Sequence, residues 1–398
     1  MSKNIVFCAD GTWNGPGEPD SDDKTAPPTN VFKLFLNLDG KDTPGTFLLE
    51  KEQERVLQDA NGIVQQWAKY LHGVGDSDNL LVRLLGGTLG AGLITRIVRG
   101  YTFISRNYVA GDKIFIIGFS RGAYTARALG GMIAAQGLLD ASKVDLTDHP
   151  HAYRLGTAVW YAYRRAALQA DTNKLQRLED TVLDIPGLLD RLPSNDLLTK
   201  APIEAIAVWD TVGALGIPEY TRTMLRIDVF RFADTKLSPV VGRGIQALAV
   251  DEEREDFSPT LWDADPRITQ ALFPGAHADV GGGYPDDDDE SGLSDRTLAW
   301  MTAQLSAAGV LFAATPTITP HPDPRGTAHE PWLQLPWDVL PRGPRAFPAG
   351  LCLSQFVIDR INDGPVLAEP EAPAAPYAPA NLTAYLKGNA AAPGVILV

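Results

Sequence analysis

Short apolar runs bounded by turn residues recur along the chain and predict buried strands. Runs that are apolar on consecutive positions, rather than on alternate ones, are typical of strands covered on both faces of a sheet. These runs are Asn4–Ala9, Lys113–Ile117, Ile203–Trp209, Ile245–Val250 and Thr269–Phe273, with a weaker run at Val64–His72.

Segments with the periodicity of amphipathic helices lie between these apolar runs. The clearest pattern has spacings of three and four and consists of Leu93, Ile94, Ile97, Val98, Tyr101, Ile104 and Tyr108. A second helix is expected over Ala123–Ala135, directly after the run at Lys113–Ile117. Because strands that alternate with helices form a mostly parallel sheet with helices on both faces, the sequence predicts one α/β domain.

Two segments interrupt the alternation. Residues 138–200 carry no strand signal but have helical stretches at Tyr153–Gln169 and Leu175–Leu192, which predict a helical cap insertion; ordinary packing helices are the alternative. From residue 316 onward proline becomes frequent. We therefore expect an α/β domain over residues 1–315 and a Pro/Ala-rich arm over 316–398 that packs on the core.

Composition narrows the class of protein. A chain of 398 residues with 44% hydrophobic content can bury a large core. The net charge of −14 argues against nucleic acid as a partner and predicts repulsion from anionic membranes. Two cysteines, Cys8 and Cys352, give no disulfide framework and are compatible with a reducing compartment. The sequence contains no run of about 18 apolar residues, so no transmembrane helix is predicted. The N-terminus lacks the pattern of a signal peptide, so we expect a cytoplasmic protein.

Gly118-Phe119-Ser120-Arg121-Gly122 follows a predicted strand and precedes a predicted helix. A serine between two glycines at such a turn forms a nucleophile elbow, in which the strained backbone lifts the hydroxyl above the sheet. The pattern alone arises by chance in glycine-rich chains, and its position between strand and helix favours the elbow. Ser120 is therefore the candidate nucleophile.

A serine nucleophile needs a base, and in the α/β-hydrolase order an acid and then a histidine follow the serine. Only His277 follows a predicted core strand, in a loop dense in glycine. The other histidines precede the serine or lie in the insertion or the arm: His72, His149, His151, His321 and His329. His277 is the candidate base, and a histidine that only stabilises a turn is the alternative.

Two aspartates compete for the role of the acid. Asp210 and Asp251 each end a predicted strand at the edge where Ser120 and His277 would lie. The chain order does not separate them. Asp279 is too close to His277 in sequence to orient it, so we expect it to brace the loop or to bind a cation.

An oxyanion needs backbone N–H donors. The residue after the nucleophile, Arg121, supplies one, and Gly11 or Thr12 after the first strand fits the second. The side chains of Arg121 and Arg127 are candidates to meet a phosphate or carboxylate, although such arginines more often form internal ion pairs.

Two other sequence patterns suggest different chemistry. Cys8-Ala9-Asp10-Gly11-Thr12 resembles the D-x-D-G-T segment of aspartate-nucleophile phosphatases, but Cys8 stands where the nucleophile is required. The acidic run Asp286–Glu290 fits a solvated surface, with a calcium site at Asp279 and Asp286 as the alternative because calcium favours clustered carboxylates. We expect no required cofactor.

The chain resembles the DUF2235 family, the α/β-hydrolase domain of type VI secretion phospholipase effectors, over about residues 3–305. The stretches that carry the resemblance are Asp10–Asn14, Asn30–Leu34, Gly73–Gly75, Ile114–Met132, Val208–Ala214, Ala249–Glu252 and Phe273–Tyr284.

The resemblance implies the roles of Ser120 as nucleophile, Asp210 as acid and His277 as base. It also implies an acyl ester or phospholipid substrate, peripheral membrane contact and secretion by a type VI system. Such effectors usually continue into a large membrane-associating region, whereas this chain has only its Pro/Ala-rich end. The alternatives are an intracellular esterase for small soluble esters and a hydrolase-fold binding module without turnover. The oligomeric state is not predicted.

Overall fold

The computed structural model describes residues 2–11, 27–43, 52–73, 89–170, 194–213, 217–220, 226–229, 235–286, 289–334, 337–339 and 341–389. Its centre is a nine-stranded sheet in which all neighbours from β13 to β4 are parallel, while β3 and β2 are antiparallel at one edge. The strands, in spatial order, are β13 (Cys352–Leu353), β12 (Ile268–Phe273), β11 (Val241–Ala249), β8 (Ile203–Trp209), β5 (Lys113–Phe119), β1 (Asn4–Ala9), β4 (Val64–Leu71), β3 (Glu52–Gln58) and β2 (Lys41–Asp42).

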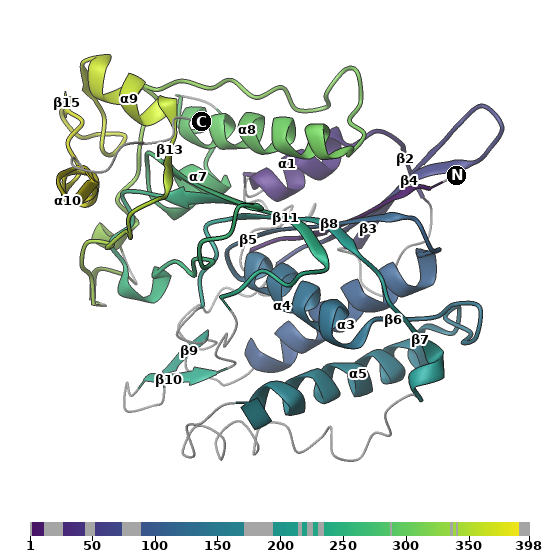
Figure 1. Cartoon of the computed structure of the whole chain (residues 1–398). Helices are drawn as coiled ribbons and strands as arrows, with labels where there is room; N and C mark the ends of the chain where they lie inside the picture. Colours follow the sequence, from purple (N-terminus) through teal and green to yellow (C-terminus); the bar gives the residue numbers. More distant parts are fainter. Residues whose placement is uncertain are drawn as a thin grey trace, which may run out of the picture.

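Helices cover both faces of this sheet (Figure 1). Successive side chains of a strand point to opposite faces, and those of β1 enter two separate apolar clusters. The cluster that contains Phe7 includes side chains of α3 (Leu89–Asn107) and α4 (Ser120–Gln136). The cluster that contains Cys8 includes α1 (Asn30–Asn37) and α8 (Gly292–Ala308). The predicted α/β class, with a mostly parallel sheet between helical layers, is confirmed.

The six strands expected from apolar runs are present, but β3 and β2 were not expected from the sequence. The sequence of β3 begins Glu52-Gln53-Glu54, which is too polar to indicate a buried strand. Lys69 of β4 pairs with Glu52 at 2.6 Å and with Glu54 at 3.2 Å, so these carboxylates are buried with a partner. Such pairing across strands is invisible in a one-dimensional hydrophobic pattern.

The described part of residues 138–200 contains the long helix α5 (His149–Ala170). It also contains the short paired strands β6 (Leu138–Leu139) and β7 (Leu198–Thr199), although no strand was expected in this segment. Helix α5 packs on α3 and α4, on the side away from the sheet (Figure 1). The helix expected at Leu175–Leu192 lies outside the described residues.

The segment after residue 315 supplies core residues as well as surface. Strand β13 extends the sheet, and Leu353 and Val357 enter a cluster with Leu248 and Leu272 of the central strands. Three elements that follow β13 lie beyond it in Figure 1: α9 (Gln355–Asn362), β15 (Ala375–Pro376) and α10 (Ala380–Asn389). Strand β14 (Pro365–Val366) pairs with β15. A separate pair of strands is formed by β9 (Ile217–Tyr220) and β10 (Arg226–Val229).

Candidate active site

The turn between β5 and α4 has the geometry of a nucleophile elbow. Ser120, the first residue of α4, has a φ of 56°, a conformation that costs a non-glycine residue about 1–3 kcal/mol. A Cβ at Gly118 would lie 2.4 Å from the Gly122 carbonyl oxygen, and a Cβ at Gly122 would lie 2.1 Å from the Ala9 carbonyl oxygen. Both flanking positions therefore require glycine, and the elbow packs directly on the end of β1.

Asp210 follows β8 and is fully buried. Its Oδ2 lies 2.6 Å from Nδ1 of His277, the first residue of the short helix α7 (His277–Gly281). The Ala249 N–H donates to its Oδ1 at 3.1 Å. Asp210 has a φ of 34°, and the described residues contain only two other non-glycine residues with positive φ, Ser120 and Asp289. Two of the three strained positions are thus residues that the sequence proposed for catalysis.

The imidazole of His277 lies in an aromatic setting. Its ring centroid is 4.6 Å from that of Phe119 and 4.9 Å from that of Phe257. With Nδ1 against Asp210, Nε2 is buried and has no hydrogen-bond partner among the described residues. Burial lowers the pKa of His277 below 6.5, although Asp210 acts in the opposite direction. The neutral imidazole, with Nδ1 protonated and Nε2 free to accept, is therefore the form expected near pH 7.

A residue that the sequence did not indicate, Arg345, completes the surroundings of Asp210. Its two terminal nitrogens donate to Oδ1 at 2.8 Å and to Oδ2 at 2.9 Å. Burial raises the pKa of Asp210, but the charge of Arg345 and the hydrogen bonds from Arg345 and His277 outweigh burial, so this pKa lies below its ordinary value. The carboxylate is therefore ionised and held on both oxygens.

The rival acid, Asp251, has different partners. Its Oδ2 accepts from the Gly275 N–H at 2.6 Å, and both oxygens accept from the Tyr377 hydroxyl at 3.0 Å. Burial raises its pKa to about 6, against the hydrogen bonds from Gly275 and Tyr377. Of the two aspartates, the structure brings Asp210 and not Asp251 to the His277 ring.

Asp10, at the end of β1, forms a buried network beside the elbow. Its carboxylate accepts from the Tyr70 hydroxyl at 2.6 Å, from the Thr29 hydroxyl at 2.7 Å and from the Gly11 N–H at 2.7 Å. Burial raises its pKa to about 6, although these three hydrogen bonds lower it. The Gly11 N–H, one of the two expected oxyanion donors, is thus engaged by Asp10. Thr12, the other, lies outside the described residues.

Arg121, the residue after Ser120, is partly buried. Burial lowers its pKa to about 9, and the positive charge of Arg96 acts in the same direction. Arg96 in turn donates to the Asp10 carbonyl oxygen at 2.8 Å. Two guanidinium groups therefore lie near the edge of the sheet where Ser120 stands.

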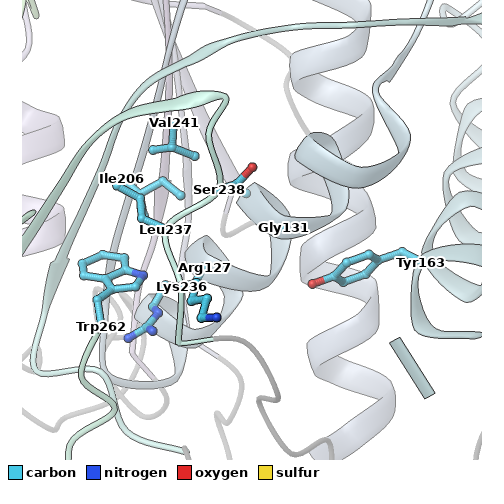
Figure 2. A pocket seen from close by; sticks show the side chains of 10 residues that line it. Arg127, Gly131, Tyr163, Ile206, Lys236, Leu237, Ser238, Val241 and Trp262 are labelled. Carbon is cyan, nitrogen blue, oxygen red and sulfur yellow. The ribbon is translucent and has the colours of Figure 1, made fainter. Parts of the chain in front are cut away.

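Arg127, six residues after Arg121 in α4, is used for internal packing. It donates to the Thr260 carbonyl oxygen at 2.6 Å and its guanidinium lies 4.3 Å from the centre of the Trp262 ring. Figure 2 shows both side chains at one end of a small hollow that also reaches Tyr163 of α5. The hollow has a volume of about 30 Å³, enough for about one water molecule.

Asp279 braces the histidine loop. Its Oδ2 accepts from the Ala276 N–H at 2.8 Å, and its Oδ1 lies 2.7 Å from Nδ1 of His329. Asp286 pairs with Lys33 at 2.7 Å. In the part of the chain that the structure describes, no group of three or more His, Cys, Asp or Glu side chains is arranged to hold a metal ion.

The parallel sheet with its serine elbow, and the Asp–His pair at the same edge, define an α/β-hydrolase fold. Residues 3–304 match the profile of the family described as "T6SS, Phospholipase effector Tle1-like, catalytic domain". The chain belongs to this family, as its resemblance to DUF2235 effectors predicted. Residues 305–398, which include Arg345, lie beyond the matched segment.

The individual proteins to which this chain is similar are longer than the chain. An uncharacterized protein of Saccharomyces cerevisiae is 26% identical over 266 residues, which are 67% of this chain and 33% of the relative. An uncharacterized protein from Pseudomonas aeruginosa has a TM-score of 0.40 and 14% identity over 78% of this chain and 46% of its own. The Tle1 effector bound to the VgrG spike of the type 6 secretion system has a TM-score of 0.36 and 19% identity over 72% of this chain and 52% of its own. The chain therefore spans about a third to a half of these proteins.

Among the described helices, none combines the length and the apolar character needed to cross a membrane.

Proposed function

We propose that the protein is a serine hydrolase that cleaves carboxylic esters of lipids, with a phospholipase A or lipase type of activity. Membership of a phospholipase effector family supports the substrate class. The observation that carries the mechanism is the 2.6 Å contact between His277 Nδ1 and Asp210, which leaves the buried Nε2 as the only acceptor on the ring. Ser120 is the nucleophile, His277 the base and Asp210 the acid that orients it.

The first half of the reaction forms an acyl-enzyme. Ser120 Oγ attacks the ester carbonyl carbon while His277 Nε2 takes the hydroxyl proton. The Arg121 N–H and a donor from Gly11 or Thr12 stabilise the oxyanion. When the intermediate collapses, the bond from the carbonyl carbon to the alcohol oxygen breaks and His277 gives its proton to the leaving alcohol. If Gly11 is the second donor, its N–H must exchange Asp10 for the oxyanion.

The second half releases the acid. Water attacks the acyl carbon as His277 takes one of its protons, the bond to Ser120 Oγ breaks, and His277 returns the proton to Ser120. The buried setting of His277 supports this cycle because the ring stays neutral, and able to accept, when each nucleophile arrives.

Labelling by a fluorophosphonate tests the nucleophile. We expect wild-type protein to be labelled and Ser120→Ala to be unlabelled and inactive while its melting temperature stays close to that of wild type. Ser142→Ala is a matched control, since Ser142 lies in an exposed turn where its hydroxyl donates to Asp140. An active, labelled Ser120→Ala variant would refute the assignment. Folded wild-type protein that never reacts would favour a binding module without turnover.

A lipid-class screen tests the substrate. We expect release of fatty acid from dispersed phospholipids, through peripheral contact with the lipid surface, and no effect of a calcium chelator. Cleavage of short-chain soluble esters alone would make the protein a general esterase. Loss of activity on chelation, reversed by calcium, would instead support a cation at the loop of Asp279 and Asp286. Delivery by a type VI secretion system is the route that family membership suggests.

A further inference from the structure

Arg345 comes from the arm and lies outside the segment that matches the family, yet it contacts the centre of the proposed site. Its side chain is buried and forms a two-pronged ion pair with Asp210, at 2.8 and 2.9 Å. The same guanidinium also donates to the carbonyl oxygens of Ala249, at 2.8 Å, and of Phe257. It therefore ties Asp210 to the strand end beside it and to the loop that faces His277.

The backbone around Arg345 is fixed on that loop. The Gly343 N–H donates to the Glu253 carbonyl oxygen at 2.7 Å, and the Glu255 N–H donates to the Pro341 carbonyl oxygen at 3.2 Å. Earlier in the arm, the Trp337 ring packs edge-on against Phe257, 5.1 Å between centroids. Phe257 itself contacts the His277 ring, so the arm and the base are linked through one short loop.

We propose that Arg345 is a positioning residue of the active site, which holds both oxygens of Asp210 so that the carboxylate fixes the orientation and tautomer of His277. This inference rests on the proposed function. A planar guanidinium suits this task because its two parallel N–H groups match the two oxygens of a carboxylate, which an ammonium group cannot do.

The charge of Arg345 has a second consequence for the base. Asp210 and Glu252 raise the pKa of His277, whereas burial and Arg254 lower it. Glu252 accepts from the His277 N–H at 3.2 Å and is itself paired with Arg254 at 2.7 Å. Arg345 is the partner that offsets the charge of Asp210. Without it, the carboxylate would stabilise the imidazolium more strongly, and the base would be protonated at a higher pH.

Two substitutions separate the roles of charge and geometry. Arg345→Gln keeps hydrogen-bond donors but removes the charge, and Arg345→Lys keeps the charge but removes the fork. The readouts are the rate of fluorophosphonate labelling and the rate of ester hydrolysis, both as a function of pH. For Arg345→Gln we expect a fall of up to about 100-fold in the limiting rate, because the base is less well positioned. We also expect the acid limb of the pH profile to move up by about one pH unit. For Arg345→Lys we expect a lower limiting rate, with the acid limb at the same pH as in wild type.

A matched control is Arg360→Gln. Arg360 is also buried in the arm, but it donates to the carbonyl oxygens of Pro324 at 2.7 Å, Gly326 at 2.7 Å and Leu367 at 3.1 Å. We expect it to lower stability and leave the acid limb in place. If the acid limb of this control also shifts, the shift in Arg345→Gln results from loosening of the arm, and the inference is overturned.

The failure of the inference differs from the failure of the proposed function. Wild-type protein that is never labelled would remove the proposed function itself. Labelled wild type, together with an Arg345→Gln variant of unchanged rate and pH profile, would overturn only the role of Arg345. If Arg345→Gln does not fold, Arg345→Lys decides: a reduced rate with a wild-type acid limb supports the inference, and a wild-type rate overturns it.

Discussion

Replacing Asp251 by asparagine separates the two aspartates that end neighbouring strands. The substitution removes a charge. It keeps a carbonyl oxygen that accepts from the Gly275 N–H and the Tyr377 hydroxyl, the two groups that donate to the carboxylate in the wild-type protein. We expect Asp251→Asn to fold, to keep its activity and to change the pH dependence of stability.

The magnitude follows from the raised pKa of Asp251. Burial lifts this pKa from 3.8 to about 6. The folded protein thus binds the proton more tightly than the unfolded chain, so the resulting stabilisation is complete below about pH 4 and is lost as pH rises through about 6. Two pKa units correspond to about 3 kcal/mol over the whole window, of which about 2 kcal/mol falls between pH 4.5 and 7. Asparagine does not titrate, so the variant gains this amount relative to wild type as pH rises.

Urea unfolding at pH 4.5, 5.5 and 7, followed by tryptophan fluorescence, measures the difference. Asp210→Asn is the companion variant; it should lose on the order of 10⁴-fold in turnover, as an orienting acid of a triad does. Parallel stability curves for wild type and Asp251→Asn would refute the raised pKa of Asp251. A variant of Asp251 as inactive as Asp210→Asn would refute the assignment of Asp210.

Two further predictions concern the elbow and the base. Gly122→Ala would place a Cβ 2.1 Å from the backbone oxygen of Ala9, so it should cost about 1–3 kcal/mol or more in unfolding free energy and abolish labelling of Ser120. Gly343→Ala is the control and should behave as wild type, because a Cβ there meets only a side-chain atom at 4.0 Å. Equal stability of the two variants in urea would contradict the packing argument. Because burial lowers the pKa of His277, the acid limb of kcat/KM should lie below pH 6.5; a limb above 6.5 would mean that Asp210 outweighs burial.

The parts of the fold that could be predicted are those in which one local pattern carries the information. The strands Ile203–Trp209 and Lys113–Phe119 are apolar on both faces, so each is recognisable by itself. The elbow is recognisable because a strained turn needs glycine on both sides of Ser120, and the spacing is fixed by the turn. His277 could be found because its loop follows such a strand.

Features that depend on pairing across the chain could not be predicted in this way. The choice between Asp210 and Asp251 rests on which carboxylate lies against the imidazole that α7 carries, and both end their strands in the same manner. His329 looks like a residue of a proline-rich tail, yet it contacts Asp279 fifty residues away. In each case the partner is set by how distant segments pack, which leaves no mark at either position alone.

Arg345 is the strongest case, and it bears on how the site is assembled. The segment Pro341-Arg342-Gly343-Pro344-Arg345 has no motif and lies beyond residues 3–304. An unpaired carboxylate as deeply buried as Asp210 is unfavourable. Among the described residues of the matched segment, its oxygens contact Nδ1 of His277 and accept from the Ala249 N–H. The positive charge that stabilises Asp210 comes from the arm. The arm is therefore expected to be needed for an ionised, oriented Asp210, and not only for covering apolar surface.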